Sequence, residues 1–169
     1  MENQAFPFNK SKSEEAQTFY RNGTQPLFTK TNIKSFLELG QLSNSHSSDD
    51  IFMHSANKPK EMVDTLRSNS GSLSTMAVNS IPPASAQSFL KHSDIPSVVL
   101  TNFEKQFSNN MYHSIYDSAD YHQYQYELGK DQKVVAHIAK VSMMVAKTII
   151  DLATGQTAPE MEDQASLVN

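Results

Sequence analysis

Short apolar segments separated by polar loops follow one another through the first two-thirds of the chain. Four of them have the length and composition of β-strands. The apolar residues of the first segment do not alternate strictly, which favours a strand buried on both faces, and a short helix is the alternative there. Gly40 in that segment predicts a close approach of another backbone. The expected strands are Ile33–Leu42, Ile51–His54, Leu73–Val78 and Ser97–Thr101.

Two segments with helical spacing lie between these strands. Apolar residues recur at helical intervals in Lys60–Ser68, which is followed by turn residues near Gly71. Pro82–Lys91 combines prolines, which a first helical turn tolerates, with an apolar face at Phe89 and Leu90. The order helix, turn, strand therefore occurs twice, which predicts an α/β fold built in layers.

The clearest single element is a helix from about Asp131 to Ala153. At 100° per residue, one apolar stripe contains Val134, Ile138, Val141, Val145, Ile149 and Leu152. Other apolar residues widen this surface and leave a narrow polar edge of Lys133, His137, Lys140, Lys147 and Asp151. A helix that is apolar over most of its circumference is expected to be buried between layers. Gly155 is expected to end it.

Composition excludes several classes of function. The 169 residues suit one domain or a piece of a larger one, and the hydrophobic share of 38% is low because of Ser- and Asn-rich stretches. A net charge of −4 without a basic cluster argues against nucleic-acid binding. The absence of cysteine excludes disulfides and thiolate metal sites. The first ten residues lack the apolar run of a signal peptide, and no window has the ~20 apolar residues of a membrane-spanning helix.

Sequence motifs with a known mechanism do not assemble a catalytic site. The chain has no Gly-rich phosphate loop, no Gly-x-Ser-x-Gly and no His-Glu-x-x-His. The six histidines share no recognised ligand spacing. A metal site formed by His113, Asp117, Asp120 and His122 is conceivable, but this spacing has weak specificity.

The segment Met111–Asp117 is the best candidate for a functional position. It follows the strand Ser97–Thr101, and residues that leave the carboxyl end of a strand are the usual place for functional groups in an open α/β sheet. In the alternative interpretation, Tyr112, Ile115 and Tyr116 are core anchors and His113 is a hydrogen-bonded polar neighbour.

Four strings of residues, in order and at comparable spacing, resemble the nicastrin family. They are Phe36–Gln41 (FLELGQ), Ile81–Leu90 (IPPASAQSFL), Ser97–Leu100 (SVVL) and Tyr112–Ala119 (YHSIYDSA). The resemblance runs from about Ser13 to Gly155. Nicastrins are the large glycosylated ectodomain subunits of the γ-secretase complex, and their large lobe is similar to zinc aminopeptidases and the glutamate carboxypeptidase family.

This resemblance implies an incomplete peptidase-like three-layer fold, in which a sheet is flanked by helices. It places His113 at the position of the last zinc ligand of the related peptidases, and Gly40 at the position of an aspartate ligand. One imidazole cannot hold a catalytic zinc ion. We therefore expect a non-catalytic pseudo-peptidase without a cofactor, in which His113 is only a vestigial candidate ligand. The alternative is a fragment of an active zinc-dependent exopeptidase.

The same resemblance implies a scaffold and substrate-gating role in the processing of membrane proteins. The expected partners are presenilin, the other γ-secretase subunits and membrane-protein substrates. The expected location is the lumenal or extracellular side of a membrane complex in the secretory pathway or plasma membrane. There, Asn22 of Asn22-Gly23-Thr24 would be the better glycosylation site than Asn9. A soluble interaction domain without activity is a third interpretation.

Three regions are expected along the chain. Residues 1–25 are expected to be loosely ordered, residues 26–155 to form the partial peptidase-like lobe, and residues 156–169 to be a disordered acidic tail. The "DYIGS" motif of the family does not occur in residues 1–12, and the acidic tail stands where the family continues toward a membrane helix. The sequence is therefore expected to be a nicastrin fragment.

Overall fold

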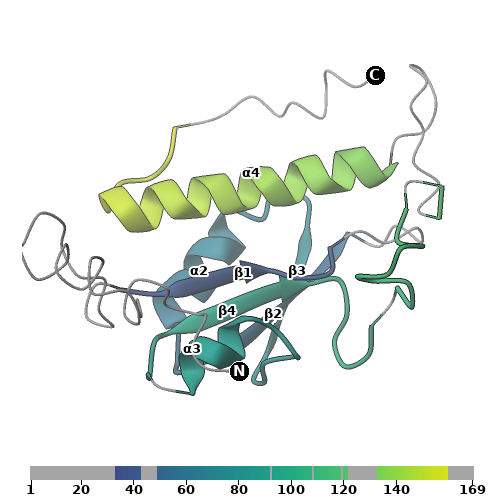
Figure 1. Ribbon diagram of the computed structural model, residues 1–169. Helices are drawn as coiled ribbons and strands as arrows, with labels where there is room; N and C mark the ends of the chain where they lie inside the picture. Colours follow the sequence, from purple (N-terminus) through teal and green to yellow (C-terminus); the bar gives the residue numbers. More distant parts are fainter. Residues whose placement is uncertain are drawn as a thin grey trace, which may run out of the picture.

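The computed structural model describes residues 33–42, 49–91, 93–107, 109–118, 120–121 and 133–159. These residues contain a four-stranded sheet in the order β1-β4-β2-β3, with helices on both of its faces (Figure 1). The strands are β1 (Phe36–Leu39), β2 (Asp50–Ala56), β3 (Ser74–Val78) and β4 (Ser97–Thr101). All four expected strands are present, and the predicted α/β fold is confirmed.

Strand β4 is one of the two inner strands of the sheet. It pairs in parallel with β1, with Leu37 opposite Val98, and antiparallel with β2, with Met53 opposite Leu100. Strand β3 is parallel to β2 at the other edge. All five residues of β4 are buried, as expected for a short β-branched strand with neighbours on both sides.

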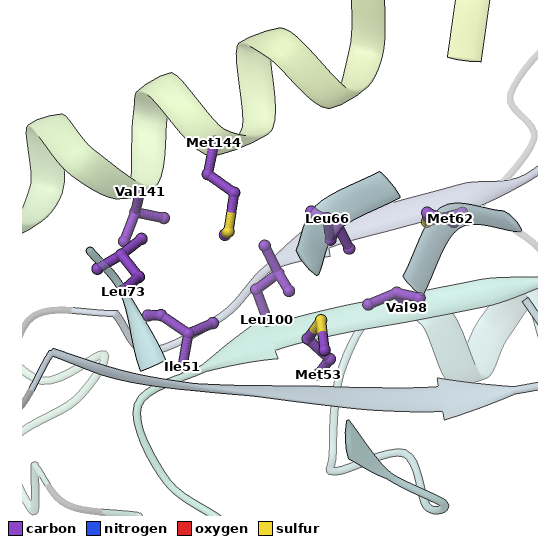
Figure 2. Packing of buried hydrophobic residues seen from close by; sticks show 9 residues of the cluster. All are labelled: Ile51, Met53, Met62, Leu66, Leu73, Val98, Leu100, Val141 and Met144. Carbon is purple, nitrogen blue, oxygen red and sulfur yellow. The ribbon is translucent and has the colours of Figure 1, made fainter. Parts of the chain in front are cut away.

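The hydrophobic core lies between one face of the sheet and the helices α2 (Lys60–Ser68) and α4 (Lys133–Thr154). Figure 2 shows how side chains from the strands and both helices point toward one another in this layer. Because strand residues alternate between faces, Val98 and Leu100 point into this core and Val99 points to the opposite face. The buried cluster consists of Ile51, Met53, Met62, Leu66, Leu73, Val98, Leu100, Val141 and Met144.

Helix α4 covers the sheet along its length but buries a different side from the predicted stripe (Figure 1). Ile138 and Ile149 are 42% and 55% exposed, whereas His137 and Thr148 are buried. The stripe prediction is wrong for the two isoleucines, and the polar-edge prediction is wrong for His137. The helix is apolar around most of its circumference, so hydrophobicity alone could not select the inner side.

Hydrogen bonds account for the side of α4 that is turned inward. His137 Nδ1 lies 3.3 Å from Asp49 Oδ1, and the Thr148 hydroxyl donates to the Met144 carbonyl at 2.8 Å. Near the end of the helix, Asn69 Nδ2 donates to Asp151 Oδ2 at 2.8 Å. The contacts of His137 with Asp49, and of Asn69 with Thr148 and Asp151, join α4 to other parts of the fold and favour this rotation of the helix. They outweigh the cost of His137 Nε2, which is buried without a hydrogen-bond partner among the described residues.

The end of α4 confirms the expected stop. Gly155 has φ +67°, and its N–H donates to the Asp151 carbonyl at 2.8 Å. This is the left-handed conformation that glycine adopts without strain after a helix.

Helix α3 (Ala86–Leu90) lies on the face of the sheet opposite α4 and is shorter than the predicted Pro82–Lys91 helix (Figure 1). Its first turn is fixed by the carboxylate of Glu38, which accepts the N–H groups of Ser85 at 3.0 Å and of Ala86 at 2.7 Å. The helix therefore begins where its N–H groups find this acceptor, not at the prolines. Its Phe89 packs against Phe36 of β1 with ring centroids 4.5 Å apart.

Strand β1 is an edge strand, so the expectation that it is buried on both faces is wrong. Its residues are only partly buried, and Leu39 is 50% exposed. Gly40, immediately after it, donates its N–H to the Leu100 carbonyl at 2.9 Å. A Cβ at Gly40 would lie 3.2 Å from that carbonyl oxygen and 3.2 Å from Thr101 Cγ2. The predicted close backbone approach is therefore present.

Several expectations fall outside the described residues. These include the loosely ordered residues 1–25 with Asn22, most of the acidic tail, His122 and the side chain of Val134. Within the described ranges, none of the helices combines the length and apolar character needed to cross a bilayer.

We predict that Asp49→Asn weakens the attachment of α4. The hydrogen bond from Lys140 Nζ (2.9 Å) lowers the pKa of the Asp49 carboxyl below 3.8; partial burial opposes this, and His137 adds to the lowering. Since Asp49 is about half exposed, the expected loss in free energy of unfolding at pH 7 is about 0.5–1 kcal/mol. This stabilisation is present above pH 3.8, the usual pKa, and is lost as the pH falls through the lowered folded-state pKa. Urea unfolding at several pH values measures it.

The control for this prediction is Asp94→Asn, which removes an exposed carboxylate from the loop before β4. A difference between Asp49→Asn and wild type that persisted unchanged at pH 2 would contradict the role of the ionised carboxylate.

We predict that Gly40→Ala destabilises the sheet by about 1–3 kcal/mol, because the new methyl group would press against a backbone carbonyl that cannot turn away. Leu39→Ala is the matched comparison, since the neighbouring side chain is half exposed and its loss is expected to cost less. Thermal unfolding of both variants measures the difference. Equal stability of Gly40→Ala and wild type would show that the two strands can separate there.

Candidate functional site

A cleft of about 490 Å³ opens at the carboxyl ends of β1 and β4, on the face of the sheet opposite α4. Its floor is formed by Gly40, Val99 and Thr101. One wall is the turn 82–85 that precedes α3, and the other is the loop that follows β4. Clefts at the carboxyl ends of parallel strands are the usual ligand positions in open α/β sheets.

Aromatic rings form the wall on the side of the loop. Phe107 lies 5.0 Å from Phe103 and 6.0 Å from Tyr112, measured between ring centroids, and the Tyr112 ring stacks on His113 at 4.0 Å. The loop thus presents a continuous row of four rings to the cleft. The prolines of the turn 82–85 face it across the opening.

Gln41 holds the loop against the end of β1. Its side-chain amide donates to the Asn109 carbonyl at 3.2 Å and accepts the Asn109 N–H at 3.0 Å. Gln41 is only 2% exposed and Asn109 5%. The side chain therefore pairs with the loop backbone as an additional strand residue would, and it sets the distance between floor and wall.

A second set of hydrogen bonds shapes the turn that carries His113. Asn109 Nδ2 donates to Asp117 Oδ1 at 2.7 Å, and the His113 N–H lies 3.3 Å from Asp117 Oδ2. His113 has φ +63°, a conformation in which histidine is enriched among non-glycine residues. Its exposed side chain lines the cleft, so the turn places the imidazole at the mouth and not in the core.

The core-anchor interpretation of this segment is wrong for two residues. Ile115 is 89% exposed and Tyr116 is 66% exposed, while Tyr112 is partly buried against the aromatic wall. The turn is too short to bring all three aromatic and aliphatic side chains to one side, because its backbone is fixed by the Asn109 and Asp117 contacts.

Glu38 is the carboxylate of the cleft, and sequence analysis did not single it out. Both of its oxygens accept N–H groups of the α3 first turn, so its charge is used to start that helix. Burial raises the pKa of the Tyr112 hydroxyl, and the negative charges of Glu38 and Asp117 raise it further. Tyr112 therefore remains a protonated hydrogen-bond donor beside the cleft at neutral pH.

His54 supports the floor from below and was also missed. It is 1% exposed, and its Nε2 lies 3.0 Å from both the Thr101 hydroxyl and the Phe103 carbonyl. The Thr101 hydroxyl in turn donates to the Phe103 carbonyl at 2.7 Å. These bonds fix the chain where it leaves β4. The only sequence signal was a histidine that ends an apolar run, which is not specific.

Of the four residues suggested as a metal site, His122 lies outside the described residues. Within the described ranges, no group of three or more histidine and acidic side chains is close enough to hold an ion. Asp117 is bound to Asn109 and to the His113 backbone, and a Cβ at Gly40 would make tight 3.2 Å contacts with the Leu100 carbonyl oxygen and Thr101 Cγ2.

We predict that Gln41→Glu lowers the free energy of unfolding by about 1–3 kcal/mol. The carboxylate keeps an acceptor for the Asn109 N–H but cannot donate to its carbonyl, and it becomes a buried charge. Gln87→Glu, at an exposed position on α3, is the matched control. Denaturant unfolding measures stability, and quenching of the exposed tyrosines reports on the loop. Unchanged stability of Gln41→Glu would contradict the role of the Gln41–Asn109 hydrogen bonds in holding the loop.

Known proteins are similar to this chain over most of its length. The family model described as the nicastrin large lobe matches residues 1–150. Mouse nicastrin is 28% identical over 148 residues, covering 73% of this chain and 21% of the mouse protein. Human nicastrin is 30% identical over 105 residues, covering 53% of this chain and 15% of the human protein. The chain thus spans about a fifth or less of the length of these relatives. It belongs to the nicastrin large-lobe family.

Proposed function

We propose that this chain is a non-catalytic, nicastrin-like scaffold of the γ-secretase complex, which restricts the access of membrane-protein substrates to the protease subunit, presenilin. The lobe would act on the lumenal or extracellular side of the membrane, with Asn22 as a glycosylation site. Family membership supports the complex, and the geometry of the cleft supports the absence of catalysis.

The packing around Gly40 is the main observation that supports a non-catalytic role. The resemblance places an aspartate zinc ligand of the related peptidases at this position. Here even a Cβ would lie 3.2 Å from the Leu100 carbonyl oxygen, and the Gly40 N–H is hydrogen-bonded to that oxygen. Glycine at this position lets β1 and β4 approach each other, so the residue has a structural role that a carboxylate could not share.

The other charged and imidazole groups of the cleft also have structural roles. Glu38 uses both carboxylate oxygens at the start of α3, and Asp117 uses both of its own in the turn around His113. His113 stacks on Tyr112 at the mouth. A peptidase needs carboxylates that are free to bind a metal ion or to activate water. In this cleft the carboxylates of Glu38 and Asp117 instead accept hydrogen bonds from the segments that form the walls.

A rigid wall suits a subunit that limits access by its shape. The hydrogen bonds of Gln41 and Asn109 join the loop to the sheet, and those of Glu38 join α3 to the sheet. Both walls of the cleft are therefore attached to β1 and the residues directly after it. Steric selection requires such a fixed surface, whereas it does not require a reactive group.

We predict that the chain, expressed with an added export signal in cells depleted of their own nicastrin, is purified together with presenilin from mildly solubilised membranes. His113→Ala should leave the recovery of presenilin within about twofold, because the side chain is exposed and its stacking partner, Tyr112, is its neighbour in the chain. An unrelated lumenal protein with the same export signal is the control. A folded chain that recovers no presenilin would contradict the proposed complex.

Metal analysis of the same purified chain distinguishes this proposal from the alternative, a fragment of an active zinc-dependent exopeptidase. We expect no stoichiometric zinc after dialysis against Zn²⁺ and no hydrolysis of aminoacyl or peptide substrates. Zinc bound one to one and lost in His113→Ala would favour the exopeptidase.

A further inference from the structure

The cleft at the ends of β1 and β4 is lined on its described residues by a carboxylate but by no lysine or arginine. The carboxylate is that of Glu38, and a second one, that of Asp117, lies in the adjoining turn, where it binds Asn109 at 2.7 Å. The chain as a whole has a net charge of −4. These charges favour a cationic ligand over an anionic one in the cleft.

The carboxylate of Glu38 keeps its charge and part of its hydrogen-bonding capacity. One oxygen accepts the Ser85 N–H and the other the Ala86 N–H, at 3.0 and 2.7 Å. An ionised carboxylate has about four lone-pair positions, so about half of them remain for a donor that enters the cleft. Glu38 is only partly buried, which leaves these positions within reach of a ligand.

The aromatic wall offers the other contact that an organic cation needs. Phe107 is 46% exposed and lines the cleft, so part of its ring is accessible there. The face of an aromatic ring is negative and attracts a cation within ~6 Å of the ring centroid. Burial, and then the charges of Glu38 and Asp117, raise the pKa of the Tyr112 hydroxyl, so the field of both carboxylates extends to this wall.

A guanidinium group matches both features of the cleft. It is planar, stacks on aromatic rings, donates to both oxygens of a carboxylate and is more weakly hydrated than an ammonium group. A metal ion fits less well, because the part of the chain that the structure describes has no group of three histidine or acidic side chains to hold one. The volume of about 490 Å³ is within the ~300–1,000 Å³ of ligand pockets.

We propose that the cleft is a binding site for an arginine side chain that an exposed segment of another protein presents. The guanidinium group stacks on the aromatic wall and donates to Glu38, while Pro82 and Pro83 contact the aliphatic stem from the opposite wall. This recognition involves no reaction, so it gives the cleft a ligand without making it catalytic. It holds whether or not the chain assembles with presenilin.

Two capped tripeptides test the proposal on the 169-residue chain. One is acetyl-Gly-Arg-Gly-amide, and the other contains citrulline, which has nearly the same shape as arginine but no charge. Followed by the amide signals of the ¹⁵N-labelled chain, the arginine peptide should bind at least about tenfold more tightly. The signals of Gly40, Phe107 and Tyr112 should move. Equal binding of the two peptides, or changes confined to residues outside the cleft, would overturn the proposal.

Salt separates attraction by charge from contact by shape without any substitution. Raising the salt concentration from about 0.01 M to about 1 M shortens the Debye length from ~30 Å to ~3 Å. The arginine peptide should lose several-fold in affinity over this range, and the citrulline peptide should change by less than about twofold. An arginine affinity that did not depend on salt would count against recognition by the carboxylates.

Phe107→Leu tests the wall, because it keeps an apolar side chain and removes the ring. The affinity for the arginine peptide should fall by about two- to fivefold. The matched control is Tyr116→Leu, at an aromatic residue that is 66% exposed and is not among the residues that line the cleft. It should leave the affinity unchanged. The same affinity in Phe107→Leu and wild type would show that the ring takes no part and would overturn the stacking.

Glu38→Gln tests the carboxylate. The arginine peptide should then bind no more tightly than the citrulline peptide, because the charge is gone. Glu104→Gln, at an exposed residue after β4 that does not line the cleft, is the matched control and should keep the preference. Since Glu38 also binds the first turn of α3, far-UV circular dichroism checks that the variant is folded. If it does not fold, the salt and Phe107→Leu results decide; a folded Glu38→Gln that retains the tenfold preference would overturn the proposal.

Discussion

The close approach of β1 to β4 at Gly40 is the constraint on which the rest of the cleft depends. Because the Gly40 N–H reaches the Leu100 carbonyl, the chain beyond β1 stays beside β4 for two more residues. The next residue, Gln41, is thereby placed where its amide can bind the loop after β4. Glu38, before it, reaches the first turn of α3. A side chain at position 40 would separate the strands and move both walls.

The same constraint decides what the polar groups at this end of the sheet can bind. The carboxyl ends of parallel strands collect functional groups because side chains and loops converge there. In this chain the polar side chains Glu38 and Gln41 bind the backbone of neighbouring segments. The result is a cleft whose polar atoms are largely engaged and whose open surface is aromatic and proline-rich.

The sequence predicted the positions of the helices and strands better than the contacts that their side chains make. Strand positions followed from short apolar runs, and Gly40 and Gly155 were correctly assigned because each meets a local backbone requirement. The rotation of α4 could not be predicted. Apolar residues surround that helix, and the inner side is favoured by the hydrogen bonds that join His137 to Asp49 and Thr148 to Asn69, both distant in sequence. The roles of Glu38 and His54 were missed for the same reason, since each depends on a partner distant in sequence.

The single antiparallel pairing in the sheet divides it into two parallel halves that point in opposite directions. The cleft is built at the end where β1 and β4 terminate, while β2 and β3 terminate at the far end. Substitutions in the connection from β2 through α2 to β3 should therefore alter the hydrophobic layer beneath α4 without reshaping the cleft. His54 of β2 is the residue of that half that must be kept, because it holds Thr101 and Phe103 at the floor of the cleft.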